Sequence, residues 1–420
     1  MLFRSKLGIL TFDYIMVGQL ELKHLPGLAE DYAGAMELVE AFVQQWRADP
    51  HGPTRKSYRH WRDRELPDHI ERCGCKDADG RYYARVRNTV WGGNSITFTM
   101  NPNPRLFADQ GLSSVGGTAL NMARQWFDTL PIDGIMIDSV GSQWPSAMNH
   151  RRDHFPYARY PLTFDPEGRV ALHNQISHYE FIEDLRRLAR SKEKLLFANG
   201  VYRYRRAGKP EFYHGVENGR FFLASLLDAA GREEVSIPTR EMLECYRVSM
   251  GRKLYATLVY DWKNADNVRR HLNRALPYAV FAGPIRSYLD NVSYLLSQDG
   301  YQRDRDLLQW FVKNCRLLFD AGWQPVTHAR VSGQDIACER YGEGDVVYFA
   351  LVNFASEPRA CELAIDLAAL HFSPEEGEMF GLSEIARGAA LQEITEGNQA
   401  RVRLELKPDE AQVVKLQRRW

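Results

Sequence analysis

The sequence predicts an α/β chain in two parts, a (β/α)8 barrel over residues 1–325 and a small antiparallel β-sandwich over residues 326–420. Between about 110 and 290, amphipathic helical segments alternate with short apolar strands, which is typical of right-handed β-α units around a parallel sheet. After about 326, apolar residues recur at every second position, which indicates antiparallel strands with one buried face. No G-x-G-x-x-G or G-x-x-x-x-G-K-[ST] motif follows a strand, which disfavours a nucleotide-binding doubly wound sheet.

Seven barrel strands can be assigned where a barrel needs eight. Each is an apolar stretch between polar or turn residues, at 8–17, 84–104, 134–138, 194–200, 211–219, 253–262 and 277–284. Helical spacing of apolar residues predicts helices near 119–130 and 176–188. Either the eighth strand lies unassigned between about 48 and 83, or the barrel is incomplete at the N-terminus. The stretch 48–83 is polar and favours a loop with a short helix. In the sandwich, the expected strands are 345–354, 361–367 and 401–406.

Composition narrows the expected partners. Hydrophobic residues make up 44% and charged residues 26% of the 420 residues, and the formal net charge is zero. Neither nucleic acid nor a membrane is therefore expected as a partner. The aromatic content is 12%, and aromatic rings suit stacking on sugar faces. The oligomeric state stays open.

Short sequence patterns indicate the cellular compartment and whether a cofactor is expected. Six scattered cysteines indicate mostly buried free thiols and a reducing compartment. The apolar run near the N-terminus is broken by Asp13 and lacks a signal-peptide cleavage site, so a cytoplasmic protein is expected. Neither H-x-H nor H-E-x-x-H occurs, so no metal is expected, and no other cofactor is indicated. The esterase motif G-x-S-x-G is also absent.

Reactive side chains of a (β/α)8 barrel stand where the strands end. The polar residues that end an apolar strand are Asp13, Asn101, Asp138, Asn199, Glu217 and Asp261. Asp138 is the strongest candidate, because strand alternation places it with Gly134 and Met136 on the face that lines the barrel. A loop of 35 residues follows it, from 139 to 173, and loops of this length are more often functional than accidental.

Asp138 also has a simpler interpretation, as a helix cap or as an ion-pair partner of Arg151 or Arg152. Its expected catalytic partner is Glu217, which shares a strand face with Gly215 and would end the sixth strand if Asp138 ends the fourth. Two carboxyl groups across a barrel mouth are what glycoside hydrolysis requires.

Glu217 could instead form an ion pair with a nearby arginine. Asp261 is its rival as acid/base. The remaining candidates are assigned to substrate binding, as sugar platforms, hydrogen-bonding groups or contacts to an acidic substituent: Asp13, Asn101, Trp144, Arg151, Arg152, Asn199, Asp261, Trp262 and Lys263.

Several stretches carry a family resemblance. The segments DGIMIDSVG, NHRRDHFPYARYPLTFDPEGR, KLLFANGVY, YHGVEN and FDAGWQPVTHARV resemble a group of uncharacterised bacterial (β/α)8 glycoside-hydrolase-like proteins that end in a small β-sandwich. The resemblance covers roughly 80 to 420. The layout is similar to the retaining α-galactosidase and α-glucosidase clan, which implies Asp138 as nucleophile and Glu217 as acid/base. The clan usually has Asp in the second role, so Glu217 departs from its pattern.

The sequence thus favours a retaining glycoside hydrolase acting on an α-linked oligo- or polysaccharide. In that case the two carboxyl groups should lie about 5–5.5 Å apart, whereas about 6.5–9.5 Å would indicate inversion. Two alternatives remain, a non-catalytic carbohydrate-binding barrel and a transglycosylase that uses the same covalent intermediate. The sugar, the linkage and endo or exo action stay open, because barrel function lies in the loops.

Overall fold

The structure, a computed structural model, describes residues 10–23, 25, 27–28, 31–49, 65–89, 93–140, 148–200, 224–235, 237–259, 262–284, 298–372, 379–385 and 389–419. These residues fall into two compact units, of which the first ends at residue 228 and the second begins at residue 229. The domain boundary at 325 stays a prediction. No helix in the described ranges has the length and apolarity needed to cross a membrane.

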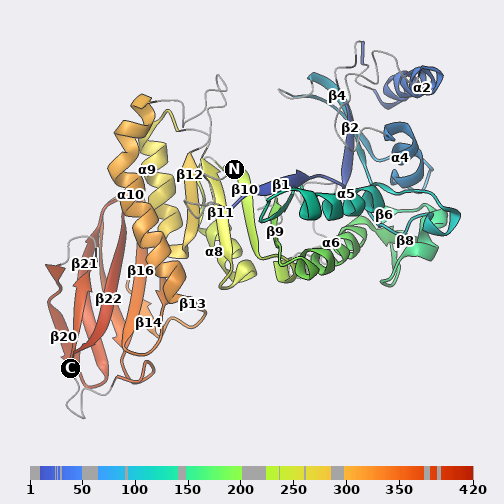
Figure 1. Ribbon diagram of the computed structural model, residues 1–420. Coiled ribbons are helices and arrows are strands. Elements are labelled where there is room, and N and C mark those ends of the chain that lie inside the picture. Colours follow the sequence, from blue (N-terminus) through green and yellow to red (C-terminus); the bar gives the residue numbers. More distant parts are fainter. Residues whose placement is uncertain are drawn as a thin grey trace. The chain divides into compact units, whose positions relative to one another are not determined.

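Parallel strands and two helices form the centre of the first unit (Figure 1). β1 (Phe12–Ile15) pairs with β5 (Gly134–Ile137), and β5 pairs with β9 (Leu195–Asn199), both in parallel. α5 (Val115–Thr129) precedes β5, α6 (Asn174–Ser191) precedes β9, and the two helices pack against each other. This part of the predicted β-α alternation is confirmed.

The buried faces of the two helices differ in how well the sequence predicts them. In α5, Ala119, Met122, Ala123 and Phe127 are buried as predicted. In α6, the predicted stripe is wrong in part, because Ile176, Tyr179 and Leu188 are only half-buried. The first turns of α6 instead bury polar side chains such as Asn174 and Glu180, which hydropathy alone assigns to the surface.

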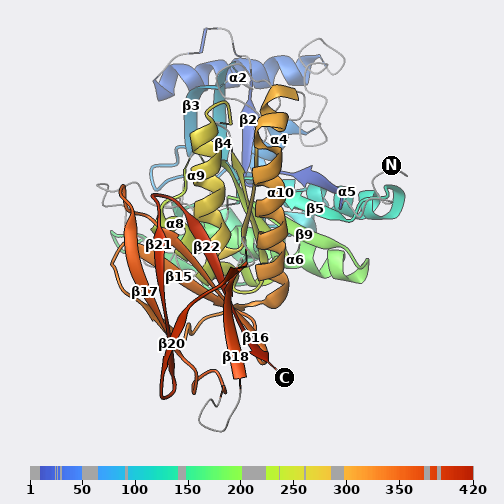
Figure 2. The same cartoon turned by 90° about the vertical axis from the view of Figure 1, so that its left-hand side faces the viewer.

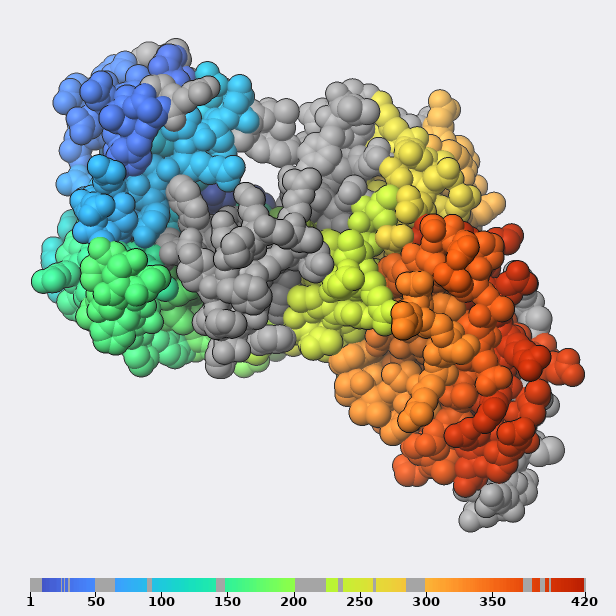
Figure 3. All heavy atoms as spheres, turned by 180° about the vertical axis from the view of Figure 1, so that it is seen from behind, coloured from blue at the N-terminus to red at the C-terminus, as the bar shows by residue number. Residues whose placement is uncertain are grey.

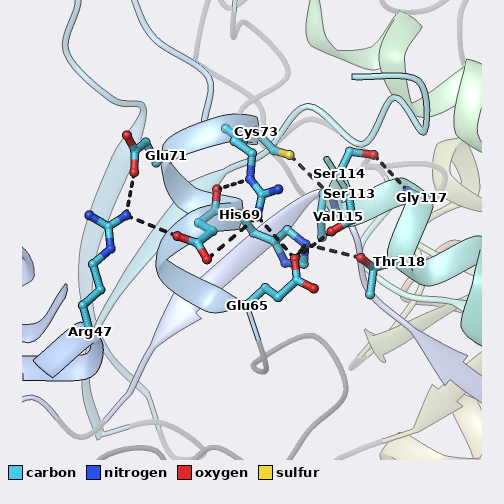
Figure 4. Close-up of polar contacts among 12 residues, drawn as sticks. Arg47, Glu65, His69, Glu71, Cys73, Ser113, Ser114, Val115, Gly117 and Thr118 are labelled. Atoms are coloured by element: carbon cyan, nitrogen blue, oxygen red, sulfur yellow. Dashed lines mark hydrogen bonds and ion pairs between the residues drawn. The ribbon is translucent and has the colours of Figure 1, made fainter. Parts of the chain in front are cut away.

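α5 is anchored at its N-terminal end to α4 (Leu66–Cys73), as Figure 4 shows. The hydroxyl of Ser113 donates to the Glu65 carboxylate at 2.6 Å, and the Val115 N–H donates to Cys73 Sγ at 3.4 Å. Ser114 is the N-cap, and its hydroxyl accepts a helix N–H, which satisfies one of the free donors of the first turn. These contacts fix where α5 begins and therefore how it leads into β5.

The stretch 84–104 was expected to be a barrel strand, and this is wrong. It forms an antiparallel hairpin of β3 (Ala84–Thr89) and β4 (Gly93–Thr99), and β2 (Gln19–Leu22) pairs with β4 on the other side. The strand order is therefore β2-β4-β3. α2 (Tyr32–Ala48) and α4 contribute to the core of this sheet, in which Leu20, Trp46, Ile70 and Phe98 are buried.

The stretch 139–173 is not an irregular loop throughout, as the sequence suggested. From 148 onward it contains the strands and 3-10 helix β6 (Met148–Asn149), η3 (Arg152–Tyr157), β7 (Thr163–Phe164) and β8 (Val170–His173). β8 pairs antiparallel with β6 and with β7. Strands of two to four residues carry too little periodicity to be read from sequence.

The second unit begins with three more parallel strands, β10 (Ala229–Val235), β11 (Leu254–Val259) and β12 (Val280–Pro284). Its helices are α8 (Arg240–Met250), α9 (Ala265–Ala275), η4 (Leu276–Tyr278) and α10 (Gln298–Ala321), and α9 and α10 lie side by side (Figures 1 and 2). The predicted strand 211–219 lies outside the described residues. The described part contains six parallel strands, three in each unit, and a closed eight-stranded barrel stays a prediction.

The strands that follow α10 form two antiparallel sheets, orange to red in Figure 2, which confirms the predicted sandwich. Figure 3 shows the atoms of this part of the chain as spheres in the same colours. One sheet has the order β13 (Trp323–Gln324), β15 (Ile336–Tyr341), β16 (Val346–Asn353), β22 (Ala411–Arg419), β18 (Met379–Glu384), β19 (Ala389–Ala390). The other has the order β14 (Ala329–Val331), β17 (Arg359–Asp366), β21 (Gln399–Leu406), β20 (Glu393–Glu396). The period-two prediction holds, because Cys361, Leu363, Ile365 and Leu404 all lie in the shared core.

Candidate active site

Asp138 directly follows β5, where the carboxyl ends of three parallel strands meet. Its backbone N–H donates to the carbonyl of Ile15 at the end of β1, at 2.7 Å. Two residues later, the Val140 N–H donates to the carbonyl of Asn199 at the end of β9, at 3.1 Å. Asp138 is therefore held between both neighbouring strands, at the sheet edge where ligands of α/β proteins usually bind.

The carboxylate of Asp138 accepts hydrogen bonds from three neutral side chains. The Asn199 amide donates to Oδ1 at 2.8 Å, and the Ser139 hydroxyl donates to Oδ2 at 3.0 Å. The Tyr14 hydroxyl also donates to Oδ2. The donors come from the ends of β1, β5 and β9, so the carboxylate is oriented by all three strands.

The strand register places aromatic side chains on the same face as Asp138. Tyr14, Met136 and Phe197 occupy one row across β1, β5 and β9, and Phe12 lies in the row below. The rings of Phe12 and Phe197 are 6.1 Å apart, and Tyr14 is 39% exposed. A polar group beside partly exposed aromatic rings is typical of ligand-binding surfaces.

Gly134 gives the Phe12 ring the room to lie on this face. A Cβ at Gly134 would come within 2.6 Å of that ring and within 2.3 Å of the Leu195 carbonyl oxygen. The opposite face carries Ile135 and Ile137, which are almost fully buried. The predicted alternation of the DGIMIDSV strand is thus confirmed.

Ser139 has a left-handed backbone conformation, with φ of 57°. A non-glycine residue rarely adopts this conformation, and such strain often lies at functional sites. Here it follows Asp138 directly, and the Ser139 hydroxyl contacts the carboxylate.

The ion-pair interpretation of Asp138 finds no support among the described residues. Arg151 pairs with Asp153 and donates to the carbonyls of Glu71 and Gly74. Arg152 is exposed at the start of η3. Both arginines were assigned to substrate binding, and the structure does not bring either of them to the Asp138 carboxylate.

Asn101 lies in a buried hydrogen-bonding network around His154. Its amide donates to Nδ1 of His154 at 3.2 Å, and the Asn149 amide donates to the same nitrogen at 2.8 Å. Nε2 of His154 donates to the Arg72 carbonyl at 2.8 Å. Burial, followed by the charge of Arg151, lowers the pKa of His154 from 6.5 to about 4.

The backbone fixes the orientation of both amides. The Asn101 amide oxygen accepts the Asn103 N–H at 3.0 Å, and the Asn149 amide oxygen accepts the Lys76 N–H at 3.1 Å. Each amide therefore turns its NH2 group toward His154, which keeps the imidazole neutral with its proton on Nε2. Asn101 is fully buried in this network, so its predicted contact with substrate stays a prediction for which the structure adds no support.

The other described candidates are Asp13 in the first unit and Trp262 and Lys263 in the second. Asp13 lies in register with Ile135, on the face opposite Tyr14, and accepts the N–H of Tyr14. In the second unit, Trp262 is 4% exposed and the Lys263 ammonium lies 5.9 Å from its ring centre. Trp144, Glu217 and Asp261 lie outside the described residues.

Two residues of the site were missed by sequence reasoning, Tyr14 and Ser139. The signal for Ser139 is its place next to Asp138. Tyr14 could have been found by continuing the alternation from Phe12 along the first strand. Among the described residues, no group of three or more His, Cys, Asp or Glu side chains is arranged to hold a metal ion.

Comparisons with known proteins give distant structural likenesses. No protein-family profile and no curated protein sequence matches the chain. A noncanonic maltogenic α-amylase of Thermotoga neapolitana is 8% identical over 98% of this chain and 79% of that one, with a TM-score of 0.49. A trehalose-6-phosphate hydrolase of Bacillus licheniformis is 10% identical over 99% and 93%, with a TM-score of 0.46. An α-amylase of H. orenii is 10% identical over 90% and 77%, with a TM-score of 0.41. Likenesses at these values assign neither a family nor an activity.

Proposed function

We propose that the chain is a retaining glycoside hydrolase that acts on an α-linked carbohydrate with Asp138 as its nucleophile. The observation that carries the proposal is the placement of this carboxylate. It stands at the shared carboxyl edge of three parallel strands, beside partly exposed aromatic rings, and forms no ion pair with a described residue. A carboxylate paired with an arginine would be a weaker nucleophile and a more ordinary structural element.

The hydrogen bonds of Asp138 indicate which oxygen attacks. Each carboxylate oxygen can accept two hydrogen bonds. From the described residues, Oδ2 accepts two, from Tyr14 and Ser139, whereas Oδ1 accepts one, from Asn199. Oδ1 therefore keeps a lone pair for the anomeric carbon, while the donors hold the carboxylate plane in place.

In the proposed reaction, Oδ1 of Asp138 forms a bond to the anomeric carbon while the glycosidic C–O bond breaks. The leaving oxygen takes a proton from Glu217. Water then attacks the glycosyl ester, gives its proton to Glu217 and releases the Asp138 carboxylate with net retention of configuration. Glu217 is proposed from the sequence alone, with Asp261 as its rival. A sugar acceptor in place of water would make the same intermediate a transglycosylation.

The experiment uses aryl α- and β-glycosides of several sugars with the full-length protein and with Asp138→Ala. We expect hydrolysis of at least one α-glycoside, lowered by roughly 10⁴-fold or more in the variant, as for other nucleophile removals. Azide should restore turnover of an activated aryl glycoside by Asp138→Ala and yield a glycosyl azide of inverted configuration. Asp128→Asn is the matched control, because Asp128 is a surface carboxylate that pairs with Lys192.

A 5-fluoroglycosyl fluoride, which slows release of the covalent intermediate, provides a direct readout. Mass spectrometry should find the sugar on the peptide that contains Asp138. Labelling of another carboxylate, or wild-type turnover by Asp138→Ala, would refute the assignment. Saccharide binding without any turnover would favour the non-catalytic carbohydrate-binding barrel.

A further inference from the structure

The second unit contains a hollow of about 250 Å³ between its helices and the sandwich sheet. It is lined by Asn273 of α9, Leu307 and Trp310 of α10, Glu384 at the end of β18, and Glu410 and Gln412 at the start of β22. Its volume is below the roughly 300–1,000 Å³ of pockets that enclose a drug-sized ligand. The hollow therefore suits a single ring of a larger molecule.

The wall of the hollow is held in place by a pair of charge-assisted contacts. Arg270 and Arg274 of α9 flank Asn273, and both donate to the Asp409 carboxylate, at 2.7 Å and 2.5 Å. Asp409 is 8% exposed, and its N–H donates to the Asn353 carbonyl of β16 at 2.9 Å. These contacts join helix α9 to the turn that carries Glu410. The lining is therefore preorganised, and a ligand would not have to order it on binding.

Hydrogen-bonding groups of both kinds line the hollow together with Trp310. The Asn273 amide can donate and accept, and the carboxylates of Glu384 and Glu410 accept. The Gln412 NH2 group donates to the Glu405 carbonyl at 3.2 Å and to the Glu410 carboxylate at 3.4 Å, so Gln412 offers its amide oxygen as an acceptor. The Lys407 N–H donates to the Glu410 carboxylate at 2.8 Å, which orients it. An aromatic face bordered by mixed donors and acceptors matches a ring with an apolar face and hydroxyl groups at its edge.

The charge of the lining further restricts the class of ligand that can bind in the hollow. Among the described residues that line it, two are carboxylates and none is a lysine or an arginine, so a phosphorylated, sulfated or uronic-acid ligand would be repelled. An ammonium ligand would leave the Asn273 amide donor without an acceptor. A neutral hydroxylated ring satisfies both kinds of group.

We propose that the Trp310 hollow is an accessory binding site for one sugar ring of a neutral polysaccharide. The ligand class follows from the lining, and its use in holding substrate for hydrolysis rests on the proposed function. The ring stacks on the Trp310 indole, its hydroxyls donate to Glu384, Glu410 and the Gln412 amide oxygen, and its oxygens accept from the Asn273 amide.

Affinity electrophoresis tests the site with soluble starch, dextran, galactomannan and xylan as neutral probes and with alginate as the acidic one. Asp138→Asn serves as the parent protein, so that the probes are not degraded. We expect at least one neutral polysaccharide to retard it and alginate to have no effect. Trp310→Ala should weaken retardation by about tenfold, as loss of a ring stack with its buried area implies. Trp310→Phe should keep most of it.

Gln412→Ala provides a second variant that leaves the indole packing intact, and it should weaken retardation as well. Retardation by none of the neutral probes, or equal retardation of the parent and both alanine variants, would overturn the proposal. Hydrolysis of small aryl glycosides should be the same in Trp310→Ala and wild type. Retardation lost in Trp310→Ala by a protein that hydrolyses no glycoside would refute the proposed function while supporting this site.

Discussion

Acidification should destabilise the fold through the buried imidazole of His154. Two amide NH2 groups point at its Nδ1, and its Nε2 proton is donated to the Arg72 carbonyl. Protonation of Nδ1 would place a third hydrogen where only an acceptor fits, in a site that water does not reach. The fold therefore accepts the neutral imidazole only.

The pKa values set both the sign and the size of the effect. His154 has a pKa of about 4 in the folded chain and 6.5 when unperturbed. Between these values the unfolded chain binds a proton that the folded chain does not, so the free energy of unfolding falls as pH falls from 6.5 to 4. A shift of this size corresponds to about 3 kcal/mol from this residue over the window. Above pH 6.5 the effect is absent.

The assay measures urea unfolding of wild type and of His154→Gln at pH 7 and at pH 4.5. Glutamine can accept from the two asparagines and donate to Arg72, but it does not titrate. We expect the wild type to lose about 2–3 kcal/mol more than the variant between the two pH values. His371→Gln is the matched control, because His371 is exposed and should leave the pH dependence as it is.

Equal pH dependence in His154→Gln and wild type would refute this reasoning. A direct check is NMR of histidine labelled with ¹⁵N, in which the signal missing from His154→Gln identifies the residue. That signal should keep the Nε2–H form down to about pH 5. Titration near pH 6.5 would show that the imidazole takes up a proton despite the two amides.

Two further substitutions test the contacts that hold the candidate sites. Gly134→Ala should lower the free energy of unfolding by about 1–3 kcal/mol, because the added Cβ would meet the Phe12 ring and the Leu195 carbonyl; an unchanged urea midpoint would contradict the close approach. Asp409→Ala should lower the thermal midpoint by several degrees, because it leaves two arginines of α9 without their shared, largely buried partner. Asp266→Asn removes an exposed ion pair on the same helix and should change the thermal midpoint little. If both variants lowered the midpoint equally, the burial of Asp409 would not explain the loss of stability.

The sequence predicted the structure correctly where a simple pattern of apolar and polar residues marks a strand or its end. An apolar run that ends in a polar residue identified both Asp138 and Asn199, and the structure brings these two side chains together at 2.8 Å. The C-terminal sandwich was equally readable in β17 and β21, because each of these strands has one buried face and one face in water. In both cases the signal lies within a few consecutive residues.

The errors arose where the structure depends on pairing between distant segments. The stretch 84–104 has the composition of a barrel strand, but it folds back on itself and pairs with β2, which lies more than 60 residues earlier. Tyr14 contacts Asp138 only because β1 pairs with β5 across 124 residues. Hydropathy also misplaced part of α6, whose polar Glu180 is buried by accepting the Asn103 amide and two backbone N–H groups. No local pattern carries such information.

The two oxygens of the Asp138 carboxylate have different surroundings, and we assign them different roles in the proposed reaction. Tyr14 and Ser139 donate to Oδ2 and come from β1 and from the strained turn after β5, whereas Asn199 is the one described residue that donates to Oδ1. A carboxylate that only stabilised the sheet would often pair with a nearby arginine. Arg151 is close in sequence, yet it is committed to Asp153 and to backbone carbonyls. Oδ1, with one donor among the described residues, is the oxygen that the proposed reaction uses.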